Sequence, residues 1–164
     1  MIKLIVAKDK NNAIGKGNLL LYYIKRDLKR FKQLTEGNVV VMGNNTFKSL
    51  PNGALKNRIN IVISTKEIES ETGEIYVKTI EEALKKAKEY NNCDIFVIGG
   101  ASVYKQFIDL NIIDMMYITE IDAETKNADK FFPIIDYNNW KKINEEEFFE
   151  NGLNFKFIDY IKKI

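Results

Sequence analysis

Asp27 is a carboxylate placed where it could serve acid–base chemistry. Ile24, Leu28, Phe31 and Leu34 recur at helical spacing, which predicts an amphipathic helix over residues 24–34. Asp27 precedes Phe31 by four residues and therefore shares the apolar side of that helix. A carboxylate that faces a core is costly unless it is paired or functional, so Asp27 is a candidate catalytic group. The alternative is an acidic residue in a first helical turn, stabilised by the helix dipole or by a surface ion pair.

The chain has no histidine, and this narrows the chemistry open to it. Ser-His-Asp triads, Cys-His pairs and histidine-ligated metal sites are excluded. Cys93, the single cysteine, can form neither an internal disulfide nor a cysteine-based zinc site, and its apolar surroundings favour a small packed residue over a reactive thiol. No metal site is expected, and any proton transfer falls to a carboxylate, tyrosine, lysine or cysteine.

Two glycine-containing junctions follow apolar runs. Gly99 and Gly100 stand between a predicted strand and a predicted helix, where they allow a phosphate or a ring to approach the backbone. The segment 42–46, Met-Gly-Asn-Asn-Thr, has the same character. Each junction is a candidate anion site, and a simple tight turn is the alternative for both.

Arg58 is a candidate anchor for a carboxylate. It follows a loop and precedes an apolar run, a position from which a guanidinium can bind a carboxylate through two parallel hydrogen bonds. The alternative is a solvated surface arginine.

Composition predicts one domain over residues 1–164. The chain is 45% hydrophobic and carries a net charge of +2. Its first seven residues are too short for a signal peptide, and no apolar run approaches the ~20 residues of a membrane span, so a cytoplasmic protein is expected. The basic stretch 25–32 contains Leu28 and Phe31 at helical spacing, which favours a solvated helix face over a nucleic-acid site.

The order of elements predicts an α/β domain. Strands are expected over 2–7, 39–42, 59–64, 94–98 and 115–121, with a late β region around Phe155, Phe157 and Tyr160. A polar loop is expected from residue 8 to about 19, a capped helix over 79–90, and a helix from the Gly99-Gly100 pair through 108. Strands that alternate with helices and then follow one another indicate a mostly parallel sheet with an antiparallel edge. Ligands of such sheets bind beyond the carboxyl ends of the strands, here after Ala7, Met42 and Ile98.

Seven ordered motifs resemble the dihydrofolate reductase family over nearly the whole chain. They are Ile14-Gly15, Asp27-Leu28-x-x-Phe31-Lys32, Val41-Met42-Gly43-x-x-Thr46-Phe47-x-Ser49-Leu50, Arg58-x-Asn60-Ile61-Val62-Ile63-Ser64, Val97-Ile98-Gly99-Gly100-x-x-Val103-Tyr104, Tyr117-Ile118-Thr119 and Asp129-x-x-Phe132-Pro133.

The resemblance implies a fold and an activity. The fold would be one domain with a central mixed, mostly parallel eight-stranded sheet flanked by helices. The protein would be an oxidoreductase that reduces 7,8-dihydrofolate to 5,6,7,8-tetrahydrofolate by hydride transfer from NADPH, supporting one-carbon metabolism and thymidylate synthesis, in a family targeted by antifolates. A monomer is expected, acting on a small molecule, with neither nucleic acid nor membrane as partner.

The resemblance also implies a substrate site. Asp27 would hold the amino group and a ring nitrogen of the pterin and favour protonation at N5, with support from a Thr119 hydrogen bond and with Tyr22 nearby as a catalytic residue. Arg58 would pair with the α-carboxylate of the glutamate tail. The implied substrate residues are Ile5, Ala7, Asp27, Leu28, Phe31, Lys32, Leu50, Arg58, Ile98 and Thr119.

The implied cofactor site has three parts. Residues 43–46 and 100–103 would hold the pyrophosphate, and Gly99 and Gly100 would be joined by a cis peptide. The implied nicotinamide residues are Ala7, Ile14, Ile98 and Tyr104, and those near the 2′-phosphate are Ser64, Thr65 and Lys78. The implied pyrophosphate residues are Gly43, Asn44, Asn45, Thr46, Gly100, Ala101, Ser102 and Val103. Three further residues, Gly15, Ile63 and Gln106, complete the implied cofactor site.

Four positions, Leu21, Tyr22, Asn44 and Ser102, depart from the family pattern. The family's Leu-Pro-Trp is here Leu20-Leu21-Tyr22, in a loop that would cover the nicotinamide. Asn44 and Ser102 stand where arginines are found in relatives, and both replacements bear on the choice of cofactor.

Two other functions stay open at this level. A reductase of the riboflavin pathway shares the fold and the nicotinamide cofactor, although Asp27 and Arg58 argue against it; an assay with dihydrofolate separates the two. A catalytically idle nucleotide-binding module is compatible with the altered loop, and nicotinamide oxidation without turnover of any pterin would support it.

Overall fold

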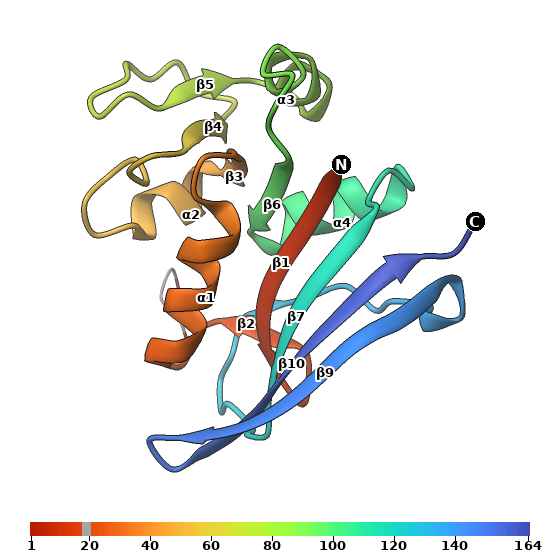
Figure 1. The fold of residues 1–164 in the computed structure, drawn as a ribbon. Coiled ribbons are helices and arrows are strands. Elements are labelled where there is room, and N and C mark those ends of the chain that lie inside the picture. The colour runs from red at the N-terminus through yellow and green to blue at the C-terminus, as the bar shows by residue number, and fades with distance from the viewer. Residues whose placement is uncertain (18–20) are drawn as a thin grey trace.

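One mixed sheet of eight strands organises the part of the chain that the computed structural model describes, residues 1–17 and 21–164 (Figure 1). The strands run in the order β5-β4-β3-β6-β1-β7-β10-β9. All pairs from β5 to β7 are parallel, whereas β10 is antiparallel to both β7 and β9. The strand bounds are β1 (Ile2–Asp9), β3 (Val39–Gly43), β4 (Ile59–Ile63), β5 (Ile75–Val77), β6 (Ile95–Gly99), β7 (Met115–Ile121), β9 (Trp140–Glu150) and β10 (Leu153–Lys162).

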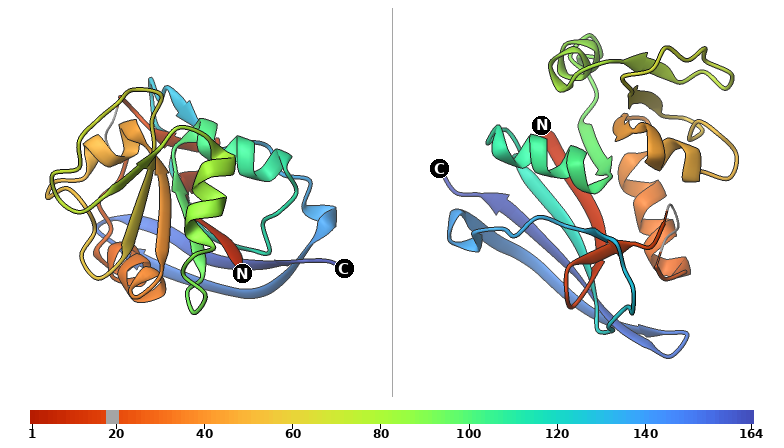
Figure 2. Two further views of the ribbon diagram at one scale, coloured as in Figure 1. Left: turned by 90° about the horizontal axis from the view of Figure 1, so that it is seen from above. Right: turned by 180° about the vertical axis from the view of Figure 1, so that it is seen from behind.

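Helices cover both faces of the sheet. In the view from above in Figure 2, α1 and α2 lie to one side of β3 and β4, and α3 and α4 lie to the other. The helix bounds are α1 (Lys25–Thr35), α2 (Asn44–Ser49), α3 (Ile80–Ala87) and α4 (Ala101–Asp109), with a short 3₁₀ helix η1 (Tyr137–Asn139). A second, two-stranded sheet pairs β2 (Ala13–Gly15) with β8 (Lys130–Phe131).

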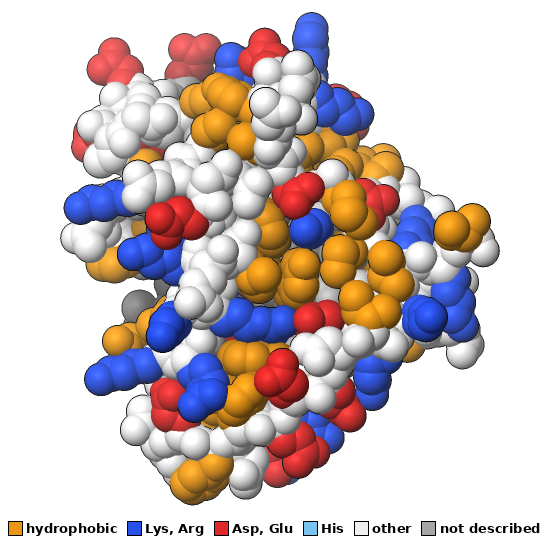
Figure 3. All heavy atoms as spheres, viewed as in Figure 1, with side chains coloured by type: hydrophobic (Ala, Val, Ile, Leu, Met, Phe, Trp, Pro, Cys, Tyr) orange, Lys and Arg blue, Asp and Glu red, His pale blue; other side chains and the backbone are white. Residues whose placement is uncertain are grey.

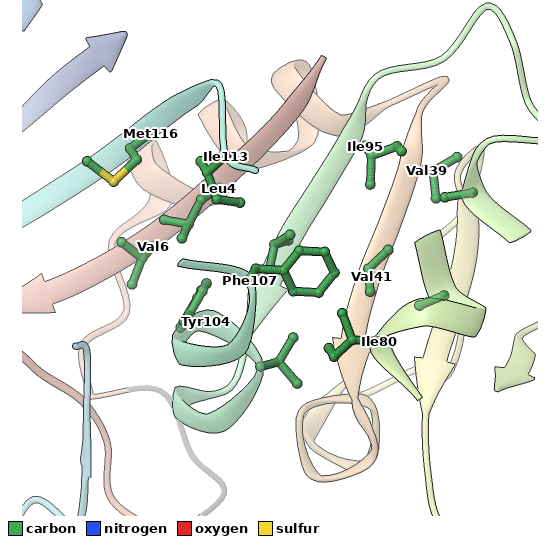
Figure 4. Close-up of a cluster of buried hydrophobic side chains, with 14 of the residues drawn as sticks. Leu4, Val6, Val39, Val41, Ile80, Ile95, Tyr104, Phe107, Ile113 and Met116 are labelled. Carbon is green, nitrogen blue, oxygen red and sulfur yellow. The ribbon is translucent and has the colours of Figure 1, made fainter. Parts of the chain in front are cut away.

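Alternation along the strands assigns side chains to the two faces. Val39 and Val41 of β3 belong to the cluster beneath α3 and α4, which includes Phe107 and is drawn in Figure 4. Val40 and Met42 point the other way, toward α1 and α2. Burial on both faces explains why β3 reads as a continuous apolar run.

The predicted architecture is confirmed, with corrections at several elements. The segment expected to be a loop from residue 8 to about 19 contains the end of β1 and all of β2; residues 18–20 lie outside the described residues. The helix expected over 79–90 ends at Ala87, and its cap Thr79 accepts the N–H of Glu82 as predicted (3.1 Å). Strands β5, β8 and β9 were not predicted individually.

Cys93 lies just before β6 and is half-buried, with its Sγ 3.3 Å from the Gly37 carbonyl oxygen. No helix of residues 1–17 and 21–164 is long and apolar enough to cross a membrane.

Glu74 is a buried carboxylate that organises the segment between β4 and β5. It accepts hydrogen bonds from the N–H and the hydroxyl of Thr72 (both 2.8 Å), and from the hydroxyls of Ser70 (3.2 Å) and Tyr76 (3.1 Å). Burial by itself would raise the pKa of the Glu74 carboxyl. The hydrogen bonds, from its own N–H and those of Thr72 and Glu71 among others, outweigh burial and lower this pKa to about 2.

Replacing Glu74 with glutamine is expected to destabilise the protein by about 1–3 kcal/mol at neutral pH, because hydrogen bonds to a charged acceptor are lost. Since the pKa of Glu74 is depressed in the folded state, its stabilising effect is full above the ordinary glutamate pKa of 4.5 and is lost as the pH falls toward about 2. Denaturant unfolding at several pH values checks this. A difference between the two proteins that stays constant from pH 7 to acid would contradict the assignment.

Candidate active site

Asp27 and Thr119 meet between two apolar clusters on the sheet face that carries α1. Asp27 lies in the first turn of α1, and the Thr119 hydroxyl on β7 donates a hydrogen bond to its carboxylate (2.5 Å). Tyr117 and Ile121, which flank Thr119 on the same face of β7, belong to separate clusters. The carboxylate therefore stands at a polar gap in an otherwise apolar surface.

Burial is the largest influence on the pKa of the Asp27 carboxyl. Burial raises the pKa of its carboxyl, while the Thr119 hydrogen bond and the positive charge of Arg30 act in the opposite direction. The net shift is upward, so Asp27 holds a proton more readily than an exposed aspartate does. This is a suitable property for a group that must favour protonation of a bound ring.

Half-buried apolar side chains lie on the same sheet face as this carboxylate. Ile5 and Ala7 on β1, Leu50 after α2 and Ile98 on β6 are neither fully buried nor fully exposed. Ile5, Leu50 and Ile98 pack on the cluster of Met42 and Phe96, and Phe31 follows Asp27 on α1. Leu28 is 37% exposed, more than expected for a residue on an apolar helix face. Figure 3 shows hydrophobic side chains gathered over β1, β7 and β10, with charged side chains among them.

Arg58 approaches the same region from the start of β4. Its Nη1 donates to the Thr35 hydroxyl (3.1 Å), its Nε donates to the Lys56 carbonyl oxygen (2.9 Å), and its guanidinium lies 5.9 Å from the ring centre of Phe31. Burial lowers the pKa of Arg58, and Glu36 opposes this shift. These two bonds use two of the five guanidinium N–H donors, which leaves donors for a carboxylate. Lys32, also expected near the substrate, is exposed in the last turn of α1.

A glycine cradle forms where α2 and α4 begin. A Cβ on Gly43 would lie 3.2 Å from Val103 Cγ2, and a Cβ on Gly99 or Gly100 would lie 3.3 or 3.4 Å from Thr46 Oγ1. Gly99 has φ 136°, a conformation that favours glycine, and the Gly99-Gly100 peptide is cis, as the resemblance implied.

The cradle has the chemistry of an anion site. The residue before α4 is Gly100, which has no side chain to cap the helix, so N–H groups of the first turn of α4 are available to a ligand. The positive end of the helix dipole adds to their attraction for a phosphate. The residues present therefore fit the pyrophosphate of a dinucleotide.

The residues expected at the adenosine end carry little free positive charge. Lys78 pairs with Glu67 (3.4 Å), and the Ser64 hydroxyl accepts the N–H of Lys66 (3.2 Å). The Ser102 hydroxyl accepts a hydrogen bond from Gln106 (3.1 Å). Val103, also expected near the cofactor, is buried on α4. Five further expected residues are partly or fully exposed: Asn44, Asn45, Ile63, Thr65 and Ala101.

Two anchors to which the sequence analysis gave no role, Asp129 and Thr125, flank the loop before α1. Asp129 accepts the N–H of Gly17 (3.0 and 3.1 Å to its two oxygens) and donates its own N–H to the Gly15 carbonyl oxygen. The hydroxyls of Tyr22 and Thr125 are 2.9 Å apart. Asp129 was visible within a family motif, but no local pattern pointed to Thr125. Leu20, which matches the family pattern just before the altered Leu21 and Tyr22, lies outside the described residues.

The residues expected near the nicotinamide lie in two different parts of the structure, one on β2 and the other in the core under α4. Ile14 and Gly15 lie on β2, beside the end of β1. Tyr104 is 4% exposed in the core beneath α4, and its hydroxyl donates to the Ile5 carbonyl oxygen (2.7 Å). This bond ties α4 to the strand that bears Ile5 and Ala7.

Comparisons with known proteins agree with this geometry. A sequence model of the family described as "Dihydrofolate reductase" matches residues 1–162. The dihydrofolate reductase of Bacillus subtilis (strain 168) is 34% identical over 99% of this chain and 95% of its own length, and that of Buchnera aphidicola is 38% identical over 93% and 92%. The solved structure of dihydrofolate reductase from Enterococcus faecalis, complexed with NADP(H) and RAB-propyl, superposes with a TM-score of 0.89 at 30% identity, covering 100% of this chain and 97% of the other.

Proposed function

This chain belongs to the dihydrofolate reductase family, and we propose that the site around Asp27 and Thr119 carries out that family's reaction. It is an oxidoreductase that reduces 7,8-dihydrofolate to 5,6,7,8-tetrahydrofolate, consuming one NADPH and one proton. The observation that carries the assignment of the site is the buried Asp27 carboxylate, which accepts a hydrogen bond from Thr119. It lies on the sheet face that bears the half-buried side chains of Ile5, Phe31, Leu50 and Ile98, here called the apolar wall.

Asp27 would bind and polarise the pterin ring. Its carboxylate can accept hydrogen bonds from the ring's amino group and from an adjacent ring nitrogen, while Thr119 fixes the orientation of the carboxylate. A negative charge, or a proton held beside the ring, makes N5 easier to protonate. Protonation at N5 draws electrons from the neighbouring carbon, which then accepts a hydride.

The apolar wall would hold the rings and exclude water. Ile5, Phe31, Leu50 and Ile98 present half-buried surface to a flat ligand, and a bound ring would complete their burial. Arg58 would bind the carboxylate of the glutamate tail and so fix the long axis of the substrate.

NADPH, when bound, supplies the hydride. The glycine cradle and the first turn of α4 would hold its pyrophosphate, and Ala7, Ile14 and Ile98 would line its nicotinamide. Tyr22, held by Thr125, would lie at the edge of this region.

The assay that tests this proposal follows NADPH oxidation with dihydrofolate as substrate. Stoichiometric formation of tetrahydrofolate is expected. Turnover of a ribosylated aminopyrimidine in preference to dihydrofolate, or NADPH oxidation without turnover of either, would contradict it. We also propose that the protein acts as a cytoplasmic monomer on small molecules alone, which sedimentation and fractionation would check.

The enzyme is expected to prefer NADPH to NADH by a smaller margin than relatives that carry both arginines. Asn44 and Ser102 can donate only neutral hydrogen bonds to the 2′-phosphate, and Lys78 is paired with Glu67. Each charge-assisted bond replaced by a neutral one loses about 1 kcal/mol, so two such losses reduce selectivity about ten- to a hundredfold.

Substituting Asn44→Arg should therefore raise the ratio of kcat/KM for NADPH to that for NADH about fivefold. Asn91→Arg, at an exposed turn before β6, adds the same charge elsewhere and is the matched control. If the native enzyme already discriminates strongly and Asn44→Arg adds nothing, Asn44 is not the weak point of 2′-phosphate recognition.

A further inference from the structure

Arg30 and Asp159 form a largely buried ion pair close to the proposed catalytic carboxylate. Arg30 Nη2 lies 2.5 Å from Asp159 Oδ1, and the two side chains are only 18% and 12% exposed. Asp159 lies near the middle of β10, directly opposite Tyr117 of β7, and its second oxygen accepts a hydrogen bond from Asn144 of β9 (3.3 Å). The pair thus links α1 to the antiparallel edge of the sheet.

Two aromatic rings fix the position of the Arg30 guanidinium. It lies 4.3 Å from the ring centre of Phe157 and 5.5 Å from that of Tyr117. A guanidinium held against two rings and paired with Asp159 has little freedom to move away into solvent. Its charge therefore stays at one place in a region that screens charge poorly.

That place is one helical turn from Asp27. Residues three apart on a helix are neighbours on its surface, and the Arg30 charge favours the ionised form of Asp27. Thr119 of β7 donates its hydroxyl to Asp27, and the charge of Asp27 also acts on the phenol of Tyr104 from α4. Burial, and after it the charge of Asp27, raise the pKa of Tyr104, so this phenol stays neutral. On this face β1 presents Ile5, Ala7 and one charged residue, Lys3, which lies over the rings of Phe96 and Tyr117 and is paired with Asp94 (2.9 Å).

We propose that Arg30 and Asp159 are positioning residues that together set the pH range over which Asp27 supports reduction. The inference rests on the proposed role of Asp27. Arg30 favours loss of the Asp27 proton, and Asp159 cancels part of that effect by neutralising Arg30. The balance of the two charges, rather than the presence of the ion pair, determines where activity declines as the pH rises.

This proposal predicts opposite effects from two substitutions that break the same bond. Arg30→Met removes the positive charge and leaves Asp159 uncompensated, so the decline in kcat/KM should move to higher pH. Asp159→Asn leaves the positive charge of Arg30 uncompensated, so the decline should move to lower pH. Each shift is expected to be roughly half a pH unit to one unit.

The pH profile of kcat/KM for dihydrofolate, with saturating NADPH, measures both shifts. The double variant, which lacks both charges, should return toward the native profile, and Arg30→Lys, which keeps the charge, should stay close to it. Lys86→Met and Glu89→Gln break an exposed ion pair at the carboxyl end of α3 and serve as controls with unchanged profiles. Shifts in the same direction, or no shift in variants that fold, would overturn the proposal, because a purely structural ion pair is broken equally by either change.

A carbon-13 NMR titration of the Asp27 carboxyl measures its pKa directly, in the native protein and in the Arg30 and Asp159 variants, without requiring turnover. If the native protein does not reduce dihydrofolate, the proposed function fails, yet opposite shifts in this titration would still support the coupling of the three residues. If the protein is active but the titration does not respond to either substitution, the coupling fails alone.

Discussion

Replacing Asp27 with asparagine is expected to lower the turnover of dihydrofolate at neutral pH by about 10²- to 10⁴-fold. Asparagine keeps the shape of the side chain and an oxygen that can accept a hydrogen bond from the Thr119 hydroxyl, but it has neither the charge nor a titratable proton. The loss should shrink as the pH falls, because solvent then supplies the proton to N5. Initial rates over a range of pH measure both effects.

The same substitution is expected to stabilise the fold at neutral pH. Burial raises the pKa of Asp27 in the folded protein above its unfolded value. Stability from this group is therefore full below the unfolded pKa and is lost as the pH rises through the folded pKa. The asparagine variant does not pay this ionisation penalty, so its melting temperature at pH 7 should equal or exceed that of the native protein.

The paired measurements distinguish a catalytic role from damage to the structure. Lower activity with an unchanged or higher melting temperature, and with NADPH binding intact, is the expected result. Near-normal activity at pH 7 would remove Asp27 from the mechanism, and lower activity with a lower melting temperature would assign it a structural role.

Replacing Arg58 with alanine is expected to weaken the binding of dihydrofolate about ten- to a hundredfold, because hydrogen bonds to a charged group contribute about 1.5–3 kcal/mol. A pterin without the glutamate tail has no carboxylate to lose, so its binding should change little. Titration of both ligands into the two proteins gives the comparison.

The bonds that Arg58 makes within the protein require a control. Its Nη1 and Nε bind Thr35 and the Lys56 carbonyl, so alanine also removes two internal contacts. Arg58→Lys keeps the charge without the planar fork and should lose part of the affinity for dihydrofolate. Thr35→Val removes the internal partner while leaving the guanidinium in place. Equal weakening of both ligands by Arg58→Ala would show that this residue supports the structure instead.

The buried strands were predictable from the sequence, and the edges of the sheet were not. β3 and β7 are apolar and bounded by polar segments, and their predicted limits differ from those observed by one residue at most. β5 has only three residues. β9 lies at the edge of the sheet, is mostly exposed and reads Trp-Lys-Lys-Ile-Asn-Glu-Glu-Glu-Phe-Phe-Glu, so burial leaves little pattern in it. Its position depends on pairing with β10.

For the site, local patterns identified single residues but not their partners. Asp27, Arg58 and the glycine pair stood out because a buried carboxylate, an arginine beside an apolar run and a strand–helix junction are visible within a few residues. Arg30 did not stand out, because a basic residue on a helix is ordinary until its partner is known. Asp159 is that partner, 129 residues away in sequence, and only the folded sheet brings the two together.

The position of β1 in the sheet has a consequence for how the protein is made. β1 is synthesised before the other strands of this sheet, yet it pairs with β6 and β7, whose partner residues follow 93 and 112 residues later. At about 5–20 residues per second, translation leaves both edges of this apolar strand without partners for several seconds or longer. Such long-range pairing slows folding and exposes strand edges to other chains. Slowed or crowded expression should therefore reveal a dependence on chaperones that the stability of the finished protein would not predict.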